Sequence, residues 1–245
     1  MRLVGSQSRT TIVLFAAVVP AWTVTLERMS GMDDGPGTDL GGLGWYLGTW
    51  ATMTVAMMLP SAAPAALLVA RASRSVPALV FALGYVAVWT AFGIVAYGLF
   101  RLVTSFETDW LAWDRGGRYV AGSAIVAAGL YELTPVKELL LRCCRRPPEP
   151  HGHRPFRKGL TNGLACVGCC LGLMTALFAL GVMSVLWMAA IGAVIFAEKA
   201  LRNGGRVARI IGIALVAVGL WTAVSPSSVP GLTEPDEAPA MQMEM

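Results

Sequence analysis

The chain of 245 residues is 56% hydrophobic and only 14% charged, with a mean hydropathy of +0.62. Soluble domains carry about 25% charged residues, so the composition indicates an all-α, polytopic membrane helix bundle. The net charge of +4 does not indicate a nucleic-acid partner, because the positive and negative residues are separated loop by loop. The sequence contains no phosphate-binding glycine-rich loop, serine triad or zinc-protease motif. We therefore predict no catalytic residues and no nucleotide-driven transport.

Seven apolar segments are candidates to cross a bilayer, which takes about 20 helical residues. The first is also compatible with a signal peptide, because Val19-Pro20-Ala21 resembles a small-residue cleavage site. The second contains Pro60 and Pro64, and prolines within membrane helices survive where they pack against protein or line a cavity. The predicted spans are 10–26, 43–70, 76–103, 118–136, 160–181, 184–199 and 207–224, forming one domain (1–224), and a disordered acidic tail containing Met follows at 225–245.

The loops between these spans alternate in charge. Most Lys and Arg residues fall on one side of the predicted membrane, and the most basic loop is 137–158. The opposite side holds only Arg28, Arg101, Arg115 and Arg118, together with most of the acidic residues. Because positively charged loops remain in the cytoplasm, we expect the amino terminus inside, the carboxy terminus outside, and a bacterial inner-membrane location.

The apolar stretch 159–199 is too long for one span and reads as two helices. Its first helix carries Cys166, Cys169 and Cys170 at positions i, i+3 and i+4, with Met174 one turn further along. This spacing places four sulfur atoms on one helical face. The sulfur-rich face is therefore the first candidate for function. The GxxxG spacings around it indicate close helix packing.

Cys143 and Cys144 follow the fourth span and lie near the mouth of this predicted site. All five cysteines fall on or near the cytoplasmic side, where reducing conditions disfavour disulfides. Free thiolates are soft ligands that suit Cu(I) or zinc. The alternative is that these cysteines act only as small apolar residues between packed helices.

Further candidate ligands are Met57 and Met58, just before Pro60, and Glu132 in the fourth span. Thioethers bind Cu(I) weakly, which suits relay, although methionine also fills gaps in cores. A buried acid needs a partner, so Glu132 either pairs with Lys137 or adds an oxygen ligand. A helical rise of 1.5 Å per residue places Glu132 level with Cys166, and Met57, Met58 and Met174 together at a deeper level.

Two other groups carry weaker predictions. Met29, Met32 and the three methionines of the tail fall in outer segments, where they either capture metal or form low-complexity sequence. Glu198 and Lys199 are adjacent at the end of the sixth span, where an ion pair at the membrane interface would explain them.

Three motifs resemble those of a bacterial family. They are W-x-x-M-x-x-AMMLPS-x-x-P at 50–64, G-x-Y-x-LTP-x-K at 129–137 and GL-x-x-G-x-x-C-x-GCC at 159–170. The family has no known function and is described as predicted metal-binding integral membrane proteins. The resemblance covers spans two to six and implies a multi-pass membrane protein. The metal ligands that it implies are Cys144, Cys166, Cys169, Cys170, Met57 and Met58.

The chain departs from that family pattern at three positions. Leu140 stands where family members often have a cysteine, Glu132 where they usually have Gln, and Leu171 where an aromatic residue follows the paired cysteines. The missing thiol at Leu140 makes a site at the cytoplasmic mouth depend on Cys143.

We predict an integral membrane protein that handles or translocates a soft metal, with Cu(I) favoured over zinc. The site is expected between spans two, four and five. Its partners would be the lipid bilayer, the metal ion and a membrane or periplasmic protein. Two alternatives remain open at this point: a membrane scaffold or accessory subunit without metal, and a thiol redox protein that uses Cys169 and Cys170. Adjacent cysteines form a disulfide only in strained geometry, so an enzyme is not favoured.

Overall fold

The computed structural model describes residues 16, 18–29, 40–72, 75–105, 116–145, 154–182, 184–201 and 203–225. Their side chains are described except at 63–72, 75–78 and 104. Most of the predicted disordered tail, Met32 and the first residues of the first predicted span lie outside this part of the chain.

All the described regular structure is helical, which confirms the all-α class. Residues 18–29 are helical. The remaining helices are α2 (Leu43–Ala72), α3 (Ser75–Ser105), α4 (Arg118–Glu132), α5 (Pro135–Arg145), α6 (Pro155–Gly181), α7 (Val185–Ala200) and α8 (Gly204–Val224). The stretch 159–199 is therefore divided between α6 and α7, and the chain turns at Gly181, whose φ is 113°.

Three segments in the described part of the chain are long and apolar enough to cross a membrane: Leu79–Val103 within α3, α6 and α8. This number is smaller than the seven that we expected. Two of the predicted spans correspond to short helices, since α4 has 15 residues and α7 has 16. A straight helix needs about 20 residues to cross the hydrocarbon core.

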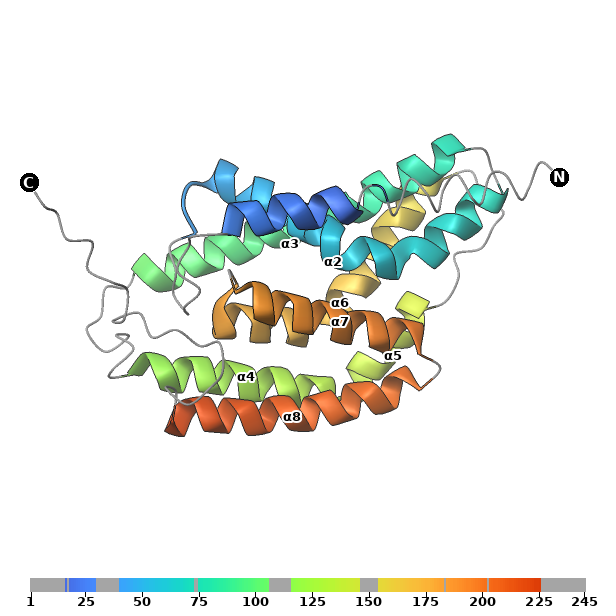
Figure 1. Cartoon of the computed structure of the whole chain (residues 1–245). Coiled ribbons are helices and arrows are strands. Elements are labelled where there is room, and N and C mark those ends of the chain that lie inside the picture. Colours follow the sequence, from blue (N-terminus) through green and yellow to red (C-terminus); the bar gives the residue numbers. More distant parts are fainter. Residues whose placement is uncertain are drawn as a thin grey trace, which may run out of the picture.

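α6 occupies the centre of the bundle and contacts α3, α4, α5 and α7. Figure 1 shows α4 and α8 side by side along one edge, α2 and α3 toward the opposite edge, and α6 and α7 between them. Glycines allow the closest contacts. A Cβ on Gly129 of α4 would lie 2.7 Å from the Gly212 carbonyl oxygen of α8, and one on Gly159 of α6 would collide with the Phe81 carbonyl oxygen of α3.

The predicted basic loop 137–158 begins instead with a helix, α5. Leu133 and Thr134 separate it from α4. The Thr134 N–H donates to the Tyr131 carbonyl at 3.0 Å, and Pro135, the first residue of α5, has no N–H with which to continue the α-helical pattern. α5 turns Lys137, Leu141 and Cys144 toward the bundle, a spacing of i, i+4 and i+7 that lines one helical face. This helix brings a half-buried thiol, that of Cys144, toward α6.

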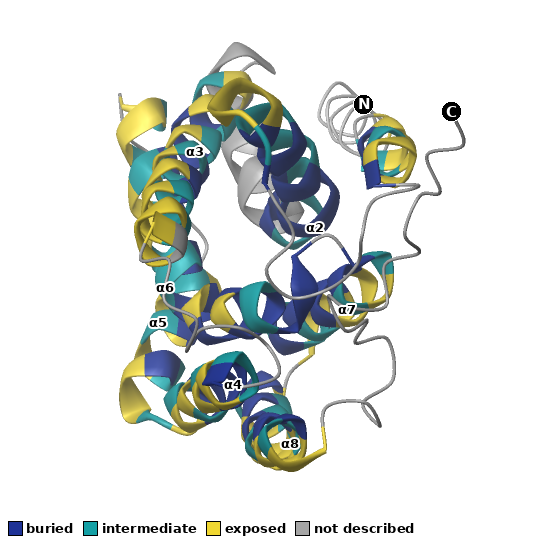
Figure 2. Ribbon diagram, turned by 90° about the vertical axis from the view of Figure 1, so that its left-hand side faces the viewer, coloured by how far each residue is buried: buried dark blue, intermediate teal, exposed yellow. Residues whose placement is uncertain are grey.

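The outward faces of the helices are exposed (Figure 2), and many of the exposed side chains are large and apolar. Val95 on α3, Ile210 and Ile213 on α8 are between 64% and 67% exposed. Large side chains of this kind are normally buried in soluble proteins, so these faces are suited to a covering other than water.

Candidate metal centre

Three cysteine thiols converge where α5 approaches α6. The Sγ atoms of Cys144, Cys166 and Cys169 all lie within 4.8 Å of one another. Cys166 and Cys169 are buried, and Cys144 is half-buried. We call these three residues the three-thiol centre. A metal–sulfur bond of about 2.3 Å lets two sulfurs on one ion lie up to about 4.6 Å apart, so small side-chain movements would bring all three onto a single ion.

Cys166 is the best-connected thiol of the centre. Its Sγ lies 2.8 Å from Tyr85 Oη, which α3 supplies, and accepts a hydrogen bond of 2.9 Å from Lys199 Nζ at the end of α7. Lys199 Nζ also donates to Ser61 Oγ of α2 at 3.2 Å. The centre is therefore enclosed by side chains from α2, α3, α5, α6 and α7, rather than by spans two, four and five alone.

The two remaining cysteines differ in position. Cys170 is buried, and its Sγ lies 3.7 Å from that of Cys169. Cys143 is exposed and is not part of the three-thiol centre. All five cysteines are free thiols. Helical spacing thus predicted that Cys166 and Cys169 lie close together, while the approach of Cys144 depends on how α5 packs.

The methionines form part of the core near the cysteines. Met57, Met58 and Met174 are each 3% exposed or less and belong to the same buried cluster as Cys166. The side chain of Met57 packs against Gly192 of α7, where a Cβ would lie 3.5 Å from Met57 Cε. The expectation that Met29 lies in an open outer segment is wrong, since it is 2% exposed and packs in the core at the end of its helix.

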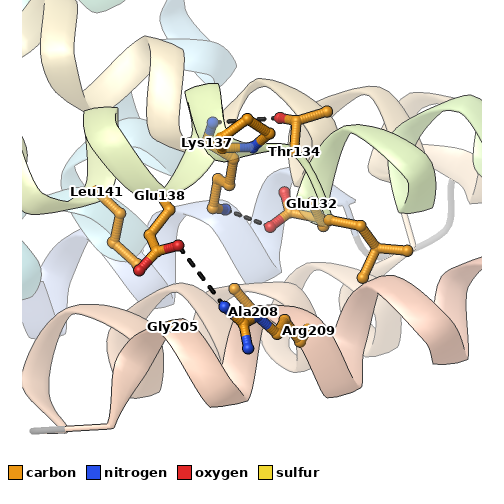
Figure 3. Close-up of a pocket in the computed structure, with 10 residues that line it drawn as sticks. Glu132, Thr134, Lys137, Glu138, Leu141, Gly205, Ala208 and Arg209 are labelled. Atoms are coloured by element: carbon orange, nitrogen blue, oxygen red, sulfur yellow. Dashed lines mark hydrogen bonds and ion pairs between the residues drawn. The ribbon is translucent and has the colours of Figure 1, made fainter.

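A second buried polar group lies next to the thiols. Lys137 of α5 forms ion pairs with Glu132 of α4 and with Glu198 of α7, the latter at 2.9 Å, and all three side chains are at most 2% exposed. We call Glu132, Lys137 and Glu198 the buried triad. Glu132 and Lys137 line a cavity of about 170 Å³, and Figure 3 shows their side chains pointing toward one another.

The buried triad changes two expectations. Glu132 lies beside Gly172 of α6, where a Cβ would be 2.8 Å from Glu132 Oε1. Gly172 is six residues, or about 9 Å, along the helix from Cys166. Glu132 and Cys166 are therefore not level, contrary to our expectation. Its pairing with Lys137 favours the structural role over a ligand role. Glu198 pairs with Lys137, rather than with the adjacent Lys199 at a membrane interface.

These contacts shift the pKa values of two groups on α5, Lys137 and Cys144. Burial lowers the pKa of Lys137, but the carboxylates of Glu198 and Glu132 outweigh burial and leave that pKa above its ordinary value. Contact with the Cys166 sulfur raises the pKa of the Cys144 thiol. Lys137 therefore stays charged, and a metal that binds Cys144 has to displace its proton.

Sequence reasoning missed Tyr85, Ser61 and Lys199 as neighbours of the thiols. The rarity of lysine was a signal for Lys199. The chain has only three lysines, Lys137, Lys158 and Lys199, and its other Lys/Arg positions are all arginine. Two of the three, buried Lys137 and half-buried Lys199, contact polar side chains of other helices. Ser61 is part of the motif AMMLPS that carries the family resemblance, whereas no pattern marks Tyr85, whose contact with the centre is made across helices.

Residues 47–222 match the family model PpoB2, which is described as a copper chaperone. The chain belongs to this family. The match includes all of α3 to α7 and the three-thiol centre. No curated protein and no solved structure matches the chain. A copper-related family and a cluster of soft sulfur donors both fit the binding of a soft metal.

Proposed function

We propose that this protein is a multi-pass inner-membrane copper-handling protein that binds Cu(I) at the three-thiol centre and passes it on. The convergence of Cys144, Cys166 and Cys169 from two helices is the observation that carries the proposal. Thiolates are the preferred ligands of Cu(I). The neighbouring Cys170, Met57, Met58 and Met174 would provide weaker sulfur sites along the same core, and exposed Cys143 would exchange copper with a partner.

Membrane insertion is the second part of the proposal. Seven crossings, with the amino terminus inside and the tail outside, agree with the alternation of loop charge. The three apolar helices and the exposed apolar faces of α3 and α8 support a lipid covering. In this arrangement α5 would lie at the cytoplasmic side, which places Cys144 where a cytoplasmic thiol partner would reach it.

The proposal is tested by the copper content of the detergent-purified protein after anaerobic loading with Cu(I). The wild type should retain about one tightly bound copper per chain, and the triple variant Cys144/Cys166/Cys169→Ser should retain almost none. Cys143→Ser is the matched control, since it removes a neighbouring thiol outside the centre. Equal copper content in the wild type and the triple variant would contradict the proposal and favour a membrane scaffold whose cysteines only pack between helices.

A further inference from the structure

The cation nearest the three-thiol centre is Lys199, and its partners are unusual. Its Nζ donates to Cys166 Sγ at 2.9 Å and to Ser61 Oγ at 3.2 Å. No ion pair between Lys199 and a carboxylate is found among the described residues, although Glu198 precedes it and pairs with Lys137. The charge of Lys199 is thus directed at sulfur.

We infer that Lys199 is a specificity-determining residue that restricts the three-thiol centre to monovalent ions. This inference rests on the proposed binding of Cu(I) at that centre. An ion bound to Cys166 would lie within a few ångströms of the Lys199 ammonium, because both contact the same sulfur. An ammonium has no lone pair, so it repels the ion instead of binding it.

The repulsion scales with the charge of the ion. At an effective dielectric constant of about 20 and a separation of about 5 Å, the second positive charge of Zn²⁺ weakens binding by on the order of a hundredfold relative to Cu⁺. A movement of the lysine side chain away from the ion would reduce this factor. The half-buried position of Lys199 at the last turn of α7 limits that movement, since Ser61 and Cys166 hold its Nζ from two sides.

Lys199 also faces the negative charge that bound thiolates would bring to the centre. An uncompensated charge in a buried site is costly, and the ammonium of Lys199 offsets one of these negative charges. Tyr85 Oη, 2.8 Å from Cys166 Sγ on the α3 side, adds a contact without adding charge.

The test is the ratio of Cu(I) affinity to Zn(II) affinity, measured for each variant by competition with a chromophoric chelator for each metal. Lys199→Gln should lower this ratio at least about tenfold. Lys199→Arg should keep it within about twofold of wild type, since the charge is retained. Arg209→Gln is the control for net charge, because Arg209 lies 68% exposed on α8 and contacts Glu138. Lys199→Met, with circular dichroism to establish folding, provides a second neutral variant.

The outcomes separate this inference from the proposal on which it rests. A lowered ratio in both neutral variants, with Lys199→Arg and Arg209→Gln unchanged, supports the role of the lysine. An unchanged ratio in the neutral variants, with normal Cu(I) binding, overturns the inference and leaves the copper site in place. Failure of wild-type protein to bind Cu(I) would remove both.

Discussion

The three-thiol centre and the buried triad share helix α5 but are built from opposite chemistry. The triad joins α4, α5 and α7 by ion pairs in which Lys137 serves two carboxylates. The three-thiol centre joins α5 and α6 by soft sulfur atoms that have no permanent anion among them. One cluster is satisfied by the protein's own charges, and the other offers ligands to an external ion. The difference is the reason why we assign the triad a structural role and propose the three-thiol centre as the copper site.

The two clusters are connected through α5. Lys137 and Cys144 are seven residues apart on the inward face of this helix, so the ion pairs that fix Lys137 also fix the position of Cys144. Glu198 and Lys199 link the clusters in the same way at the end of α7. We therefore expect a substitution in the triad to displace the thiols, whereas substitution of a thiol should leave the ion pairs of the triad unchanged.

The largest effect is expected from Lys137→Met, which leaves Glu132 and Glu198 buried without their cation. Removal of one partner of a buried ion pair costs about 3–5 kcal/mol, and the free energy of unfolding should fall by that amount. Chemical unfolding in detergent, followed by circular dichroism, measures it. Copper affinity should fall as well, because Cys144 loses its fixed position.

Glu138→Gln is the matched control for that variant. Glu138 is on the same helix and contacts Arg142 at 2.5 Å, but its side chain is 37% exposed. Exposed ion pairs contribute about 0–1 kcal/mol, so the change in stability should be small. If Lys137→Met were as stable as Glu138→Gln, the triad would not hold the helices together.

A smaller effect is expected at the contact of α3 with α6, which brings Tyr85 to Cys166. A methyl group in Gly159→Ala would collide with the Phe81 carbonyl oxygen, and forced separation of packed elements costs about 1–3 kcal/mol. Gly98→Ala, at a position of α3 where a Cβ meets nothing within 4 Å, should be neutral or slightly stabilising. Equal unfolding free energies for the two variants would contradict the close contact.

Most of the helical fold and part of the candidate site could be predicted from sequence, for physical reasons. The apolar runs of α3, α6 and α8 and the spacing of Cys166, Cys169 and Cys170 are local patterns that follow directly from helix periodicity. α5 could not be predicted in this way, because its basic residues resemble a solvated loop. The contacts of Lys199 and Cys144 with Cys166 depend on packing between helices distant in sequence.

The most direct test of the central claim, that Cys144 of α5 and the α6 cysteines hold one copper ion, is X-ray absorption of the Cu(I)-loaded protein. We predict ligation by sulfur alone in the wild type, an unchanged spectrum in Cys143→Ser, and one sulfur fewer in Cys144→Ser. Nitrogen or oxygen ligands in the wild type, or a Cys144→Ser spectrum identical to that of Cys143→Ser, would contradict the account.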